Sequence, residues 1–158
     1  MVTHVKQPKF FTGFSLIEMM VVVSIIAILA AIAIPSFQSL IRNQRVKSSS
    51  YELFTSLMVA RSEAIKRNAD ITVTPITAGS WQDGWQISAG TTAIKNQEAL
   101  KGIAVSSAPN SLTYKRTGRL SSAMATFQIS INPADAAYVR CLTIELSGLP
   151  RTKKGACS

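Results

Sequence analysis

The sequence predicts an α+β protein in which one long N-terminal helix packs on a C-terminal antiparallel β-sheet domain. Two observations carry this prediction. Apolar residues recur at helical spacing as far as about residue 68, and beyond that point they alternate or form short runs between turn residues. The chain has 158 residues, so the part beyond its apolar N-terminal segment forms one globular domain at most.

The N-terminal segment is apolar over residues 13–34 except for a single charge, Glu18. At a rise of ~1.5 Å per residue, about 20 such residues cross the roughly 30 Å hydrocarbon core of a bilayer. Residues 14–34 are therefore expected to form a transmembrane half of the helix. An ionised side chain at this depth costs about 2.5–3.5 kcal/mol on insertion scales, so Glu18 should have a cationic or hydrogen-bond-donating partner.

Three interpretations of this N-terminus compete. A cleaved secretory signal fits the basic start at Lys6 and Lys9 and the small residues of the Ala31-Ile32-Ala33 segment, but it does not fit an acidic residue in the apolar region or Pro35 just behind the cut. A plain single-pass anchor explains the length and gives Glu18 no role. The third interpretation is a leader that is processed before the apolar segment.

The third interpretation uses every feature, because Gly13-Phe14 followed by Glu18 resembles the processing site of type IV pilins and of the pseudopilins of type II secretion. The resemblance implies that a prepilin peptidase removes the basic leader, residues 1–13, and methylates the new amine of Phe14. It also implies that Glu18 pairs with the N-terminal amine of a neighbouring subunit, which fits the physics because two charges that leave water are tolerable only when they meet. The peptidase acts at the cytoplasmic face, so the resemblance places the β-rich domain, residues 69–158, in the periplasm and the anchor in the bacterial inner membrane.

Residues 35–68 are expected to continue the helix as an amphipathic half. Pro35 should kink a membrane-embedded helix rather than end it, and the helix should stop near Asn68 to Asp70. Polar residues, Ser56 among them, should lie off the centre of its apolar stripe. The apolar positions of that stripe are Leu53, Phe54, Leu57, Ala60, Ala64 and Ile65.

The C-terminal part is expected to form one antiparallel sheet or two small sheets. The predicted strands are residues 71–74, 85–88, 103–106, 112–115, 125–131 and 139–146. Turn chemistry separates them at Asp83-Gly84, Ala108-Pro109-Asn110, Thr117-Gly118, Asn132-Pro133 and Gly148-Leu149-Pro150. Trp81 and Trp85 flank the first of these turns, and they are expected to staple a hairpin to the helix rather than to stack on nucleic acid bases.

Several downstream segments narrow the resemblance to the H-type pseudopilin and FimT/FimU minor-pilin family. They are residues 57–68, residues 81–85, Gly118-Arg119, Phe127 and residues 147–157. This resemblance implies a low-abundance subunit at or near the tip of a thin filament, where it helps start assembly with other major and minor pilins. Type IV pilus membership is preferred on the basic bias and the paired cysteines, and the alternative is an H-type minor pseudopilin of type II protein secretion.

Cys141 and Cys157 are the only cysteines, and the chain without its leader has no histidine that would complete a metal site with them. A disulfide is the preferred interpretation; it requires an oxidising compartment such as the periplasm. Closing a loop of this length would stabilise the fold by about 3 kcal/mol in the chain-entropy model. The alternative is a pair of reduced, buried thiols.

The charge balance raises the question of an anionic partner, since +9 for the full chain leaves +7 after removal of Lys6 and Lys9. Cations reaching out from loops grip phosphates in a salt-dependent and sequence-independent way, so DNA is one expected partner. Solvated basic surface, acidic neighbours or lipid head groups are the alternative. The DNA-binding candidates are Lys115, Arg116, Arg119, Arg151, Lys153 and Lys154.

One motif associated with DNA binding in the resembled family is present only in part. Some of its members carry Gly-Arg-x-Arg near the C-terminus, whereas the matching stretch here is Gly148-Leu149-Pro150-Arg151. The first arginine is therefore missing, and only Arg151 corresponds to the motif.

Enzymatic activity is not expected. The sole histidine, His4, lies in the leader, so the processed chain lacks the usual general base for a serine or cysteine nucleophile. No glycine-rich phosphate loop is present, and neither a cofactor nor a metal is implied. Besides Glu18, the acidic residues are dispersed without ligand spacing, as Glu52, Glu63, Asp70, Asp83, Glu98, Asp135 and Glu145.

Overall fold

The computed structural model describes residues 13–131 and 136–157. The expected leader up to residue 12, the expected turn at Asn132-Pro133 and the acidic Asp135 lie outside the described residues. The chain divides into two compact units at Ser39 and Leu40, and one helix, α1 (Leu16–Arg67), contributes to both.

Helix α1 continues through Pro35 and ends at Arg67, as the sequence predicts. Its end is closed by Asn68, which adopts a left-handed φ of 51°. The Asn68 N–H donates to the Ile65 carbonyl at 3.3 Å, and the Ala69 N–H donates to the Ala64 carbonyl at 3.2 Å. These two bonds form a Schellman motif, so the helix stops because its last carbonyls are satisfied by the turning chain.

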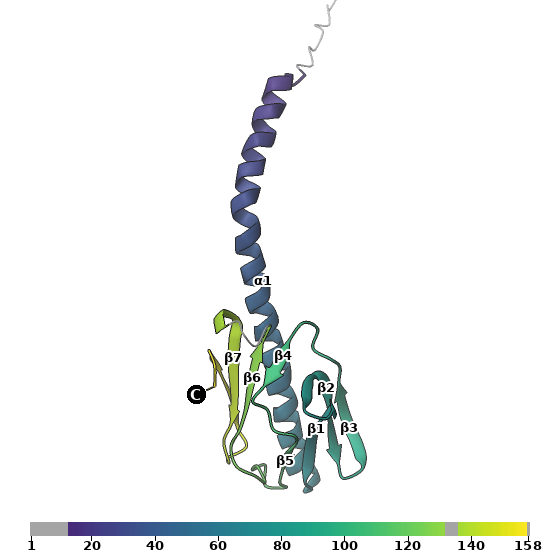
Figure 1. The fold of residues 1–158 in the computed structure, drawn as a ribbon. Helices are drawn as coiled ribbons and strands as arrows, with labels where there is room; N and C mark the ends of the chain where they lie inside the picture. The colour runs from purple at the N-terminus through teal and green to yellow at the C-terminus, as the bar shows by residue number, and fades with distance from the viewer. Residues whose placement is uncertain (1–12, 132–135, 158) are drawn as a thin grey trace, which may run out of the picture. The chain divides into compact units, whose positions relative to one another are not determined.

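The second unit holds two four-stranded antiparallel sheets beside the C-terminal part of α1 (Figure 1). The first has the order β3-β2-β1-β5, and the second has the order β4-β6-β7-β8, with a short 3-10 helix before β7. The α+β prediction and the option of two small sheets are thereby confirmed. The strands are β1 (Ile71–Thr77), β2 (Ser80–Ala89), β3 (Thr92–Gln97), β4 (Ala104–Ser106), β5 (Leu112–Tyr114), β6 (Ala125–Ser130), β7 (Val139–Ile144) and β8 (Pro150–Lys154), and the 3-10 helix is Ala136–Tyr138.

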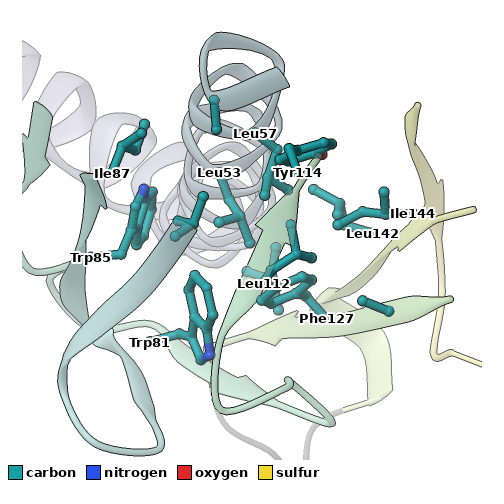
Figure 2. Packing of buried hydrophobic residues seen from close by; sticks show 14 of the residues in the cluster. Leu53, Leu57, Trp81, Trp85, Ile87, Leu112, Tyr114, Phe127, Leu142 and Ile144 are labelled. Carbon is teal, nitrogen blue, oxygen red and sulfur yellow. The ribbon is translucent and has the colours of Figure 1, made fainter. Parts of the chain in front are cut away.

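The core of this unit lies between α1 and the two sheets. Figure 2 shows Leu53 and Leu57 of α1 facing aromatic and aliphatic side chains from both sheets. Trp81 of β2 meets Phe127 of β6 edge to face, with ring centroids 4.8 Å apart. The Trp81 Nε1–H also donates to the Pro109 carbonyl at 2.7 Å, so this one ring joins both sheets and a loop.

Two positions of the predicted stripe on α1 differ in the structure. Ser56, expected off the centre, is buried, and Ile65, expected within it, is exposed. The spacing explains both, because Ser56 lies three residues after Leu53 and four before Ala60, on the buried face. Ile65 follows buried Ala64 by one residue, which turns it about 100° away from that face.

The prediction of a turn at Asp83-Gly84 is wrong, because both residues lie inside β2. Glycine is required at position 84 by the backbone conformation and by a close neighbouring strand, and not by a turn. Its φ is 96°, and a Cβ at this position would lie 2.3 Å from the Gln97 carbonyl oxygen. Trp81 and Trp85 are therefore four residues apart on one strand, and both are fully buried, which confirms their role in packing and excludes base stacking in this fold.

Candidate functional site

The N-terminal end of α1 carries the residues expected at the processing and assembly site. Ser15 directly precedes the helix, and its N–H donates to Glu18 Oε2 at 2.8 Å. In return, the Glu18 N–H donates to Ser15 Oγ at 3.3 Å. This reciprocal pair is a capping box, which satisfies two backbone donors at the helix start.

The sequence reasoning missed this capping role of Glu18, although the Ser-x-x-Glu spacing of Ser15 and Glu18 signals it. Gly13 and Phe14 come directly before the cap, and both are exposed. A Cβ on Gly13 would meet no atom within 4 Å. The peptide bond between Gly13 and Phe14 is therefore accessible in this structure.

In the described part of the first unit, residues 13–39, every large apolar side chain is exposed, by between 47% at Val22 and 83% at Phe14. Among the described residues, α1 is the one helix long and apolar enough to cross a membrane. Beside Glu18, an open apolar hollow of about 310 Å³ is lined by Phe14, Ile17, Val21 and Val22. The carboxylate thus lies at the polar end of an otherwise apolar surface.

The turn between β5 and β6 carries three of the six expected DNA-binding residues. Lys115, Arg116 and Arg119 are exposed, and Lys115 closes the turn by exchanging backbone hydrogen bonds with Gly118 and Arg119 at 2.7 and 2.8 Å. The Arg116 N–H donates to Asp70 Oδ1 at 3.1 Å. An open hollow of about 560 Å³ lies here, lined by Asn68, Ala69, Asp70, Lys115, Arg116 and Thr117.

The other three cations lie on a strand, which corrects the expectation that they project from a loop. Arg151, Lys153 and Lys154 are exposed on β8, the edge strand of the second sheet. Lys153 lies opposite Cys141, and Lys154 lies opposite Arg140. Because successive residues of a strand face opposite ways, Arg151 and Lys153 share one face, and Lys154 lies on the other. Arg151 is also 3.7 Å from the Glu145 carboxylate.

The two basic segments adjoin where their turns meet. A Cβ on Gly148, between β7 and β8, would lie 2.0 Å from the Gly118 carbonyl oxygen. The same oxygen accepts a hydrogen bond from Arg61 Nε of α1 at 2.9 Å. The helix therefore holds the β5–β6 turn in place, and this turn holds the β7–β8 turn, so Arg151 lies three residues from the junction.

Cys141 of β7 and Cys157 form a disulfide, as the sequence predicts, with 5.0 Å between their Cα atoms. The Cys157 N–H donates to Gln128 Oε1 of β6 at 3.3 Å. The alternative of two reduced thiols is therefore wrong. The bond fixes the segment after β8 to the middle strands of the second sheet.

Nothing in the described residues 13–131 and 136–157 resembles a metal site, since no group of three or more His, Cys, Asp or Glu side chains comes together there. Several acidic side chains have structural partners instead. Glu18 caps α1, Glu63 pairs with Arg67, and Glu145 pairs with Arg151. The hydrogen bond from Arg67 lowers the pKa of the Glu63 carboxyl.

Two known protein families match this chain, one in each unit. The family described as type II transport protein GspH matches residues 50–148, from the second half of α1 to the turn after β7. The chain belongs to the GspH family. A second family, the prokaryotic N-terminal methylation motif, matches residues 9–34, which include Gly13, Phe14 and Glu18.

Solved structures share the fold of this GspH-family chain. The type IV minor pilin FimU of Pseudomonas aeruginosa is 24% identical, with 68% of this chain and 91% of that chain covered and a TM-score of 0.61. The minor pseudopilin EpsH of the Vibrio cholerae type 2 secretion system is 17% identical, with 70% and 97% covered and a TM-score of 0.54. The likeness extends to a pilus subunit and to a secretion subunit alike. The fold is therefore type IV pilin-like, and the likeness does not distinguish a pilus subunit from a secretion subunit.

Proposed function

We propose that the protein is a minor pilin or minor pseudopilin, a structural subunit that primes or caps a thin filament. The observation that carries the proposal is the first part of α1, where every large apolar side chain is exposed and a capped helix begins at Leu16, three residues after Gly13. Such a surface is stable only among lipid tails or other helices. A filament subunit needs both environments in turn, first the membrane and then its neighbours.

In this proposal, prepilin peptidase cuts after Gly13, removes the leader and methylates the amine of Phe14. Residues 14–34 then anchor the chain once in the bacterial inner membrane, with residues 69–158 in the periplasm. The disulfide supports an oxidising location for the second unit. The match to the N-terminal methylation motif supports the processing step.

Glu18 is proposed to set the register of assembly. In the free chain its carboxylate is held at the helix start by the Ser15 N–H, two residues from the cut. In a filament, the N-terminal amine of a neighbouring subunit provides a charged partner at the same end of the helix. A carboxylate and an amine that both leave water stabilise the assembly only as a pair, so each subunit is fixed at one height.

The test compares Glu18→Ala with Glu18→Gln, because glutamine keeps the capping acceptor and removes the charge. We expect both variants to be processed, and both to co-purify with neighbouring pilins much less than the wild-type chain does. Glu63→Ala, which removes a carboxylate from the other end of the same helix, is the control and should assemble normally. Normal assembly of Glu18→Gln would show that the charge has no role in register.

We propose that the protein belongs to a type IV pilus, because the chain is strongly basic. The alternative is that it is an H-type minor pseudopilin of type II secretion. The GspH family match and the FimU and EpsH folds support the two equally. Co-purification decides between them, since the processed chain should associate either with type IV pilins or with pseudopilins.

DNA binding is a second proposed function, and it has a specific observation in its favour. The β5–β6 turn and the β7–β8 turn meet at Gly118 and Gly148, which places Lys115, Arg116 and Arg119 beside the start of the strand that carries Arg151. Exposed cations on ordered turns can contact successive phosphates. This function would add DNA capture to the filament role.

A further inference from the structure

A groove that is lined by none of the six expected DNA-binding residues lies between α1 and the edge of the second sheet. Its volume is about 290 Å³. The helix supplies five lining residues, β7 supplies Arg140, and β8 supplies Thr152. The helical residues are Gln44, Lys47, Ser48, Ser50 and Tyr51.

The groove is rich in hydrogen-bond donors and lacks a lining acid. Arg140 Nε is buried and has no hydrogen-bond partner within the described residues. Neither Arg140 nor Lys47 forms an ion pair with an acidic side chain in the part of the chain that the structure describes. An unsatisfied buried donor is costly, and the cost is larger for a charged group, so this site favours a bound acceptor.

A third cation adds to the positive charge near the groove. Lys154 of β8 lies directly opposite Arg140 of β7, so the two side chains share one face of the sheet. Like charges directly opposite each other are destabilising in an antiparallel pair. Neither cation of this pair forms an ion pair with an acidic side chain among the described residues. An anion from outside the chain would therefore relieve a repulsion that the fold itself leaves in place.

We propose that this groove binds a carboxylate side chain, Asp or Glu, of a neighbouring subunit in the filament. The inference rests on the proposed filament function. The recessed position of Arg140 suits a single side chain that reaches inward, and its planar guanidinium matches a carboxylate in a paired, two-bond geometry. Lys47 and the hydroxyl of Thr152 lie at the same groove and can hold the second oxygen.

The rim of the groove has the composition of a protein–protein interface. Tyr51 is 67% exposed, and its ring stacks on Phe54 with centroids 6.1 Å apart and an interplanar angle of 13°. Tyrosine and arginine are among the residues most enriched at the centres of such interfaces, where an aromatic surface excludes water from a charged contact. A neighbouring subunit fits this surface better than a nucleic acid backbone does, because duplex phosphates contact protruding cations.

The experiment uses the full chain, expressed in its own host with its filament partners, and measures incorporation by co-purification. Arg140→Glu and Lys47→Glu each place a negative charge in the groove, and we expect each to lower incorporation by about tenfold or more. Lys95→Glu, an exposed charge reversal on β3, is the matched control and should leave incorporation unchanged. Lys47 lies on the exposed side of α1, so its variant tests the groove even if Arg140→Glu fails to fold.

A selection for restored assembly identifies the partner charge. Suppressors of Arg140→Glu should change an acidic residue of one pilin or pseudopilin to a basic one. Wild-type incorporation of both Arg140→Glu and Lys47→Glu would overturn the groove proposal, and so would variants that lose only DNA binding, because the ligand would then be a phosphate. If the wild-type chain itself fails to incorporate, the filament function and the groove proposal both fall.

Discussion

Gly148 lies where the turn between β7 and β8 meets the turn after β5. Its φ is 78°, nearly the same as the 77° of Gly79 between β1 and β2, but a Cβ on Gly79 would meet no atom within 4 Å. A side chain added at either position would therefore cost about 1–2 kcal/mol in backbone strain. Only at Gly148 would the added Cβ also collide with another part of the chain.

The first prediction concerns these two glycines. Gly79→Ala should destabilise the compact unit, residues 40–158, by about 1–2 kcal/mol. Gly148→Ala should cost clearly more, by about 2 kcal/mol or above, because its Cβ also collides with the Gly118 carbonyl. Urea unfolding of both variants measures the difference. Equal losses would mean that the two turns do not hold each other in place.

Tyr114 supplies a prediction about pH. Its side chain is fully buried, its hydroxyl has no hydrogen-bond partner among the described residues, and burial raises the pKa of the phenol above the ordinary value of 10.0. In the unfolded chain the phenol loses its proton near pH 10, whereas in the folded chain it keeps the proton, so stability must fall as pH rises above about 10.

Tyr114→Phe should therefore flatten the loss of stability between about pH 9 and 11. At pH 7 it should cost about 1 kcal/mol or less, since no hydrogen bond is broken. Tyr51→Phe, at an exposed tyrosine, is the control and should leave the alkaline loss unchanged. Chemical unfolding at a series of pH values provides the measurement, and an unaltered alkaline slope in Tyr114→Phe would contradict the assignment.

At the scale of elements, the strands found from sequence are those that present apolar side chains to the core. Leu112 and Tyr114 of β5 and Phe127 and Ile129 of β6 are buried and spaced two residues apart, so alternation reveals both strands. The two missed strands, β3 and β8, are edge strands with mostly exposed residues. Such strands are defined by backbone pairing with a neighbour, and a polar sequence carries no sign of it.

Strand β8 is held at its end by the disulfide as well as by pairing with β7. Replacing Cys141 and Cys157 with Ala should destabilise the compact unit by about 3 kcal/mol, the chain-entropy value for a loop of this length. The wild-type unit under reducing conditions should lose a similar amount, and reductant should leave the variant unchanged. Urea unfolding with and without reductant tests this, and equal stability of the oxidised unit and the variant would count against a stabilising role.

At the scale of the whole molecule, local motifs were predicted from sequence and sites built from distant residues were not. Gly13, Phe14 and Glu18 lie within six consecutive positions, so one short pattern is enough to predict them. The proposed subunit groove of Lys47 and Arg140 depends on a helix and a strand that are far apart in the sequence. Only the packing of α1 against the second sheet brings these residues together, and no spacing rule anticipates it.

The same limit applies to the six expected DNA-binding cations, which the sequence groups and the structure divides. Lys115, Arg116 and Arg119 occupy one turn, and the junction at Gly118 and Gly148 brings the start of β8 next to it. Lys154 instead shares the face of Arg140 at the proposed subunit groove. The turn residues with Arg151 therefore form the surface to test for DNA.

The last prediction is that alanine at Lys115, Arg116, Arg119 and Arg151 weakens DNA binding by the full chain in neutral detergent. The slope of log affinity against log salt concentration should become shallower by about 0.9 on duplex DNA for each removed cation that neutralises a phosphate. Lys154→Ala should change it less, because Lys154 lies on the other face of β8 from Arg151, and Lys95→Ala is the surface control. Duplex and single strands titrated at several salt concentrations give the slopes. An absence of wild-type binding at low salt would leave these cations to solvent, lipid or subunit contacts, whereas equal slopes for the fourfold variant and the wild type would place the DNA elsewhere on the chain.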